Sequence, residues 1–226
     1  MSHKKVLVYF ELNLLFMKTT LLLALIMVIQ GCNFADSDAS LNREGYVSNV
    51  DQKPREYFVY LPKGYQQASD KTWPVLLFLH GNGERGNGLD ELDFVLKHGP
   101  LYEAWIQKKD LPFIIISPQL HMYDFDKKLD YIGNRTRDEI PQRLEKGVEA
   151  RPKAFATSQP IQRAQSVTSM NDVAPLLPLG WEKSERDLLS ILDAVTAKYR
   201  VDTKRTYLSG LSYGGFGTWY MASKHP

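Results

Sequence analysis

Gly210-Leu211-Ser212-Tyr213-Gly214 is the stretch of sequence that decides the fold. The pattern Gly-x-Ser-x-Gly is typical of a serine on a sharp turn between a strand and a helix, where the hydroxyl stands exposed above a sheet. Gly210 and Gly214 leave room for this turn, because a side chain at either position would collide with the turn itself. An apolar stretch precedes the motif and a helix-compatible stretch follows it. We therefore expect Ser212 to be a catalytic nucleophile rather than an incidental serine in a glycine-rich turn.

Apolar stretches alternate with amphipathic ones along the chain. Short apolar runs bounded by turn residues predict strands, and apolar residues three or four apart predict helices. The expected strands are 57–61, 75–79, 113–117 and 206–209, and the expected helices are 89–97, 185–199 and 215–222. Such alternation predicts an α/β fold with a mostly parallel sheet and helices on both faces.

A second glycine-rich motif, His80-Gly81-Asn82-Gly83, directly follows one predicted strand. Acyl transfer needs two N–H donors for the oxyanion, one after the nucleophile and one from a loop after an early strand. We expect the backbone amides of Tyr213 and Asn82 in these roles, with Gly83 as the alternative to Asn82. The Gly81 position lets the loop approach the substrate closely. His80 is expected to support the loop by hydrogen bonding, because the base of this architecture follows the nucleophile in the chain.

Both motifs resemble those of secreted carboxylesterases related to polyhydroxybutyrate depolymerases and feruloyl esterases, a group often placed with the prolyl oligopeptidase-like α/β-hydrolases. The resemblance runs from about Tyr57 to Pro226 and includes His98-Gly99-Pro100 and Ser117-Pro118-Gln119. It implies a carboxylic ester as the substrate, small or polymeric, and a brace for the oxyanion loop at Glu84 and Arg85. No cluster of side chains in the sequence implies a metal or a cofactor.

The residues after Ser212 do not complete a catalytic triad. In this fold the order is serine, then a carboxylate, then histidine, but residues 213–226 contain no Asp or Glu. His225 is separated from Ser212 by a helix of roughly 20 Å and is expected to end that helix. The expectation is a partial hydrolase domain, 55–226, without its C-terminal strands, with one exposed sheet edge and inactive by itself.

The N-terminus resembles an export signal. An apolar core of about nine residues follows Met17-Lys18 and ends at Ile29-Gln30-Gly31-Cys32, which is similar to a bacterial lipoprotein box. Residues 1–32 are therefore expected to form a signal peptide whose true start is Met17. Cys32, the only cysteine in the chain, is the expected lipidation site and membrane anchor. A plain secretory signal or a buried N-terminal helix remains the alternative.

Composition leaves two segments without a strong pattern. Residues 33–54 predict a flexible tether, and residues 120–180 predict a long insertion that is either a lid or a disordered excursion. The formal net charge of +2 and the lack of a basic, aromatic-rich patch exclude a nucleic-acid binder. Three functions stay open: an ester hydrolase, a prolyl oligopeptidase-like peptidase, or a non-catalytic, surface-anchored binding protein.

Overall fold

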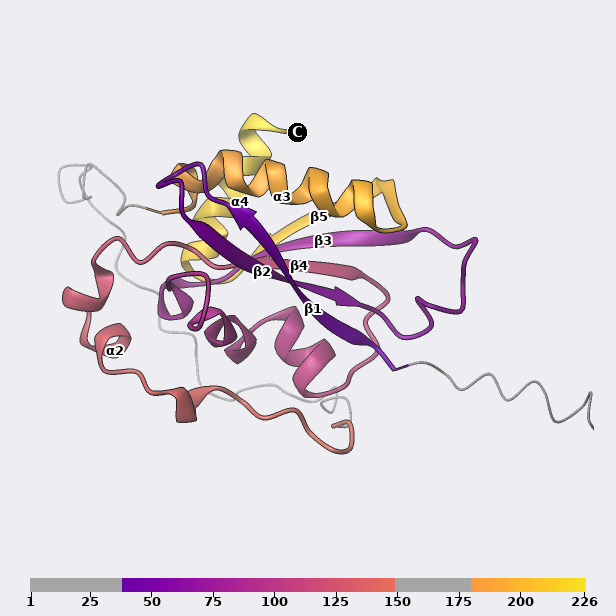
Figure 1. Ribbon diagram of the computed structural model, residues 1–226, viewed down its shortest axis with the longest axis horizontal. Helices are drawn as coiled ribbons and strands as arrows, with labels where there is room; N and C mark the ends of the chain where they lie inside the picture. The colour runs from indigo at the N-terminus through magenta and orange to yellow at the C-terminus, as the bar shows by residue number, and fades with distance from the viewer. Residues whose placement is uncertain (1–37, 149–179) are drawn as a thin grey trace, which may run out of the picture. The chain divides into compact units, whose positions relative to one another are not determined.

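A computed structural model describes residues 38–148 and 180–226, and within them a five-stranded sheet carries the fold (Figure 1). The strand order is β1-β2-β4-β3-β5. The first three strands of this order pair antiparallel, and β3 pairs parallel with both β4 and β5. The strands are β1 Ser40–Val47, β2 Pro54–Leu61, β3 Trp73–Leu79, β4 Ile114–Pro118 and β5 Val201–Gly210. The sheet is thus mixed, and its parallel part leads to Ser212.

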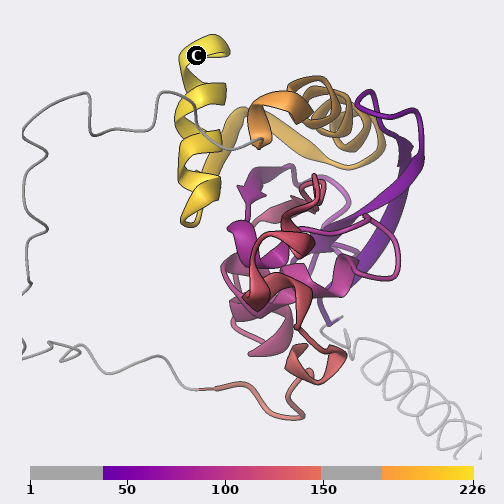
Figure 2. The same ribbon diagram turned by 90° about the vertical axis from the view of Figure 1, so that its left-hand side faces the viewer.

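Helices cover both faces of the sheet (Figures 1 and 2). Helices α3 (Glu185–Lys198) and α4 (Tyr213–Lys224) lie on one face, and the short helices η2 (Leu92–Lys97) and η3 (Tyr102–Ile106) lie on the other. The side chains of β2 alternate between two apolar cores. Tyr57, Val59 and Leu61 pack in the core under α3 and α4, while Phe58 and Tyr60 pack in the core over η2 and η3. Alternation in a strand buried on both sides, with helices covering both faces of the sheet, confirms the predicted α/β class.

Most predicted elements are confirmed, but the predictions for residues 40–54 and 89–97 are wrong. The expected tether, 33–54, contains strand β1, which pairs along its full length with β2. The sequence gives no apolar run there because β1 is an edge strand held largely by backbone pairing. The helix predicted over 89–97 is a short 3₁₀ helix over Leu92–Lys97, since the Asn87 side chain accepts the amide of Leu89 and caps the preceding turn.

The insertion predicted over 120–180 is ordered in its described part. Residues 120–148 form three short helices, η4 (Phe125–Lys127), α2 (Asp130–Gly133) and η5 (Arg137–Glu139). Arg135 anchors this segment to the glycine-rich loop by donating to the carbonyl of Gly83 at 2.9 Å. The disorder expected for this segment is therefore wrong up to residue 148. The remainder lies outside the described residues.

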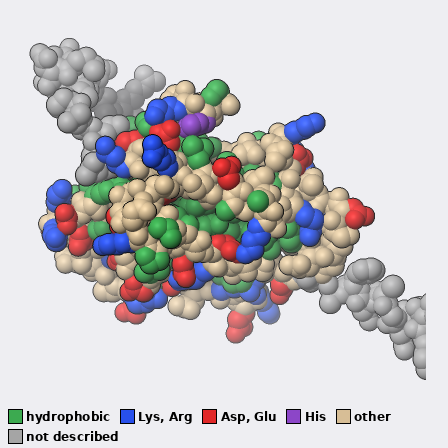
Figure 3. Space-filling model, turned by 45° about the horizontal axis from the view of Figure 1, so that its top comes forward, with side chains coloured by type: hydrophobic (Ala, Val, Ile, Leu, Met, Phe, Trp, Pro, Cys, Tyr) green, Lys and Arg blue, Asp and Glu red, His purple; other side chains and the backbone are tan. Residues whose placement is uncertain are grey.

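The signal peptide, Met17 and Cys32 also lie outside the described residues. No helix of 38–148 or 180–226 is long and apolar enough to cross a membrane. The described part carries charges of both signs interspersed with apolar side chains, as the face seen in Figure 3 shows. Within the part of the chain that the structure describes, β5 is an edge strand that pairs only with β3.

A buried polar network joins the start of α3 to the ends of the neighbouring strands. Ser48, His121 and Asp187 expose at most 4% of their surface. Ser48 donates to Asp187 at 2.6 Å, and Asn49 donates to the same carboxylate through its backbone and side chain at 2.6 and 2.9 Å. Burial alone would raise the pKa of Asp187, but the hydrogen bonds from His121, Ser48 and Asn49 outweigh it and lower the pKa to about 2.

Replacing Asp187 is expected to make stability less dependent on pH. The folded-state pKa of Asp187 lies below the unfolded value of roughly 3.9. The stability that its ionised carboxylate contributes is therefore present above pH ~4 and is lost as the pH falls through about 2. Asp187→Asn should lower the free energy of unfolding by about 2 kcal/mol at pH 7, and this difference should shrink towards pH 2. Urea unfolding measured at both pH values checks this. Asp193→Asn, an exposed change on the same helix, is the control and should shift stability by less than about 0.5 kcal/mol.

Candidate active site

Ser212 sits on a strained turn between β5 and α4. Its backbone has φ 51° and ψ −116°, a conformation that costs a non-glycine residue on the order of 1–3 kcal/mol. Its side chain is exposed, and it is the N-cap residue of the twelve-residue helix α4. The helix therefore directs its positive end at the serine hydroxyl. This geometry is the one that the Gly-x-Ser-x-Gly pattern predicts.

The turn is fixed by backbone contacts with the end of β3. The amide of Leu211 donates to the carbonyl of Leu79 at 3.0 Å. A Cβ on Gly214 would lie 1.8 Å from that same carbonyl oxygen, and a Cβ on Gly210 would lie 2.1 Å from the carbonyl oxygen of Gly214. Real Cβ contacts do not come this close. Both glycines are therefore required by close backbone approach, as the sequence indicates.

His80 supports the loop opposite Ser212, as expected. Its side chain is buried and its Nε2 accepts the amide of Leu120 at 2.9 Å, so Nδ1 carries the proton and donates to the carbonyl of Gly81 at 2.7 Å. Burial lowers the pKa of His80 to about 4, and the charge of Glu84 only partly opposes this. The ring is neutral at pH 7 with both nitrogens occupied. The contacts of His80 therefore hold the loop in place and leave neither ring nitrogen facing Ser212 without a partner.

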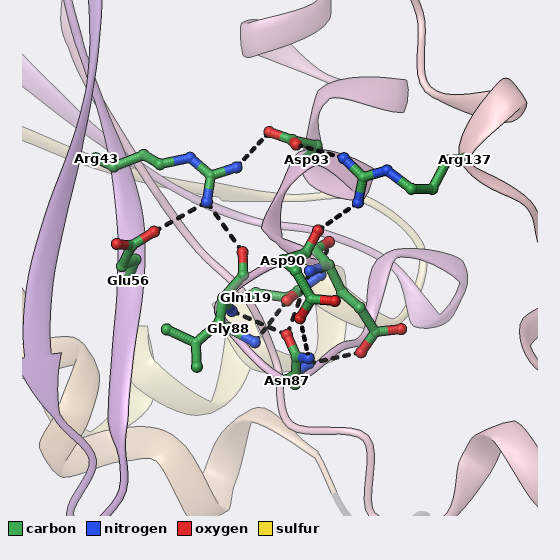
Figure 4. Close-up of polar contacts among 10 residues, drawn as sticks. Arg43, Glu56, Asn87, Gly88, Asp90, Asp93, Gln119 and Arg137 are labelled. Carbon is green, nitrogen blue, oxygen red and sulfur yellow. Dashed lines mark hydrogen bonds and ion pairs between the residues drawn. The ribbon is translucent and has the colours of Figure 1, made fainter.

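Two polar side chains brace the loop from below. Gln119 donates to the carbonyls of Glu84 and Glu91 and accepts the amide of Gly88, at 2.8, 2.7 and 2.8 Å, and Figure 4 shows it beside Gly88 and Asn87. Arg85, fully buried, donates to the side chain of Asn82 at 2.9 Å. The bracing role expected of Arg85 is in agreement with these contacts. The loop is thereby held rigid where it faces the serine.

A hollow of about 410 Å³ brings the two motifs together. Its lining includes Ser212 and Leu211 from the turn and Gly81, Asn82 and Gly83 from the loop. A Cβ on Gly81 would lie 3.4 Å from the Ser212 Cβ, so the loop passes directly beside Ser212. Tyr213, the first residue of α4, places its backbone amide at the helix start next to Ser212.

His225 is not brought to this hollow. It ends α4, where its Nε2 lies 2.9 Å from a carboxylate oxygen of Glu185. Among residues 38–148 and 180–226, no hydrogen bond joins the Ser212 hydroxyl to a side chain. The buried set of Ser48, His121 and Asp187 is not a second active site, because the Ser48 hydroxyl is inaccessible and donates to the carboxylate.

One pair of site residues was missed by sequence reasoning. Glu84, expected only to brace the loop, also hydrogen bonds to Nδ1 of His98, and both residues line the hollow with Ser212. The Glu84 side chain is 5% exposed, whereas that of His98 is 56% exposed. Fourteen positions separate the two in the chain. No local pattern links them, although each stands in a motif that the resemblance includes.

The described residues contain no group of three or more His, Cys, Asp or Glu side chains arranged to hold a metal ion. An exposed serine hydroxyl at a helix N-terminus, beside a glycine-rich loop, is an arrangement that suits attack on a carbonyl carbon.

Comparisons with known proteins give distant structural neighbours. No protein-family model and no curated protein matches the sequence. A thermostable esterase is 19% identical to this chain, with a TM-score of 0.44. The match covers 82% of this chain and 38% of the esterase chain. A feruloyl esterase module from Clostridium thermocellum is 15% identical, with a TM-score of 0.41, covering 83% and 50%. A ferulic acid esterase from Anaeromyces mucronatus is 18% identical, with a TM-score of 0.39, covering 84% and 56%. The chain thus spans 38% to 56% of the length of these three structures.

The two adjacent glycines of α4 should respond oppositely to alanine. Gly214→Ala places a methyl group against the Leu79 carbonyl and should cost about 3 kcal/mol or more of unfolding free energy. Gly215→Ala is the matched control, because a Cβ there meets nothing within 4 Å and should raise stability by up to about 1 kcal/mol through helix propensity. Urea unfolding followed by circular dichroism measures both. Equal effects of the two changes would contradict the close approach.

Proposed function

We propose that this chain carries the nucleophile and oxyanion half of a serine hydrolase acting on carboxylic esters. The observation that supports this best is the strained, exposed Ser212 at the start of α4, facing the loop Gly81-Asn82-Gly83 across one hollow. Backbone strain at a single non-glycine residue persists where function requires the side chain in that place. A structural turn would need no serine there.

The expected chemistry follows from the directions of these groups. The Ser212 hydroxyl attacks the ester carbonyl, and the carbonyl oxygen becomes negatively charged in the tetrahedral intermediate. The amides of Tyr213 and Asn82, with Gly83 as the alternative, stabilise that charge together with the N-terminus of α4. Collapse of the intermediate releases the alcohol and leaves the acyl group on Ser212.

The described residues do not give Ser212 a base. A serine hydroxyl is a weak nucleophile without one, and oxyanion stabilisation alone still supplies roughly 10³-fold to 10⁴-fold over water. For this chain we therefore propose slow acylation at Ser212. With no base among the described residues, deacylation is expected to be slower still, so the acyl group should accumulate.

Two alternatives use the same hollow. A prolyl oligopeptidase-like peptidase would share the nucleophile and differ only in the leaving group. A non-catalytic binding protein would keep the turn for its shape. The lining of the hollow does not favour an amide over an ester. The more reactive carbonyl of the ester makes it the substrate that a serine without a base can attack.

Acylation of Ser212 is tested by mass spectrometry. Incubation with a fluorophosphonate or with p-nitrophenyl butyrate should add one label or one butyryl group to Ser212, faster at high pH, where hydroxide replaces the base. Ser212→Ala should remove this labelling entirely, while Ser223→Ala, which changes a serine near the far end of the same helix, should not affect it. A folded chain that is not labelled would favour the binding protein, and faster acylation by a prolyl peptide would favour the peptidase.

We further propose that the protein is exported and anchored to a membrane by lipid at Cys32. This rests on the sequence Ile29-Gln30-Gly31-Cys32 after a short apolar core. Expressed in a bacterium, the chain should sediment with membranes, and Cys32→Ser should release it to the soluble exported fraction. Immunoblots of the fractions measure this, and an unchanged distribution would contradict the anchor.

A further inference from the structure

A second hollow continues the one beside Ser212. It has a volume of about 540 Å³ and is lined in part by Tyr102, Glu103 and Glu139. Three residues line both hollows: Lys97, His98 and Leu211. They therefore stand where a substrate attacked by Ser212 would pass from the first hollow into the second.

Of these three side chains, only that of His98 can accept a hydrogen bond. Leu211 is apolar, and the ammonium group of Lys97 is paired with Glu139 at 2.5 Å. Nδ1 of His98 is held by Glu84, and Nε2 has no partner among the described residues. The junction of the hollows thus presents one free ring nitrogen, on a ring that is more than half exposed.

The buried carboxylate of Glu84 sets the hydrogen-bonding character of that nitrogen. An ionised carboxylate only accepts hydrogen bonds, so Nδ1 of His98 carries the proton and donates to it. In the neutral ring Nε2 is then an acceptor. A bound molecule that satisfies it must bring a donor, and in an ester that donor is a hydroxyl group.

The position of Glu84 ties this ring to the nucleophile. A Cβ on Gly81 would lie 3.4 Å from Oε2 of Glu84 and also 3.4 Å from Cβ of Ser212, so these two atoms are less than twice that distance apart. The carboxylate that orients His98 therefore belongs to the same rigid loop that faces Ser212. A hydroxyl bound at Nε2 would position the ester relative to the serine.

We propose that His98, oriented by Glu84, is a specificity-determining residue that accepts a hydrogen bond from a hydroxyl group of the ester. The inference rests on the proposed function and deepens it by naming the substrate class: esters of hydroxylated alcohols, whose free hydroxyl lies at the junction of the two hollows. The covalent step remains at Ser212, and His98 acts on binding and position.

The test measures binding rather than turnover. In the Ser212→Ala chain, ligand-detected NMR titrations compare glycerol 1-monobutyrate with propyl butyrate, two esters that share an acyl group and differ by two hydroxyls. The glycerol ester should bind about fivefold more tightly, the effect of one net hydrogen bond. Adding His98→Phe should remove the preference, and adding His98→Gln, whose side-chain oxygen can accept in place of Nε2, should retain most of it.

Equal binding of the two esters, a preference that survives His98→Phe, or no binding of either ester would overturn the inference. Folding of each variant is verified by its amide NMR spectrum, so that loss of preference is read only from folded protein. Because these titrations do not use the serine, their failure is distinct from failure of the proposed function, which shows as an unlabelled Ser212.

Discussion

The approach of the Gly214 backbone to the Leu79 carbonyl is the contact on which the site depends. It joins the start of α4 to the end of β3, and the Leu211 amide bonds to the same oxygen. The strand that ends at Leu79 continues directly into the loop beginning at His80. Ser212 and the glycine-rich loop therefore start from one backbone junction, and the strain at Ser212 is offset by the packing of both elements around it.

Polar groups on the buried side of the loop serve rigidity rather than chemistry. His80 uses both ring nitrogens on backbone groups, and Gln119 uses its amide on three more. Arg85 reaches from the loop to the carbonyl of His121, which stands in the network around Asp187. Each of these three buried side chains makes at least two hydrogen bonds to surrounding groups, and such networks specify a single geometry. The exposed side chains of Ser212 and His98 differ from these buried ones. Among the described residues, the Ser212 hydroxyl and Nε2 of His98 have no hydrogen-bond partner.

Much of this arrangement could be predicted from the sequence, because the decisive constraints are local. Apolar runs predicted the inner strands, and two glycines around a serine predicted the turn. Strand β1 was missed since an edge strand needs no apolar face, and its pairing partner is set by backbone hydrogen bonds. The Glu84–His98 pair was missed because it depends on how two loops pack across the sheet end, which residue spacing does not encode.

Leu211 differs from the glycines of the turn because its backbone is fixed while its side chain is free to vary. Its backbone is committed to Leu79, yet its side chain is 42% exposed and lines both hollows. A change of side chain there reshapes the walls without disturbing the junction beneath. Tolerance to substitution is thus uneven at the site: Gly210 and Gly214 cannot carry a side chain, whereas the side chain of Leu211 can change. In proteins with this arrangement, a substitution at this position would change ligand preference with the smallest loss of stability.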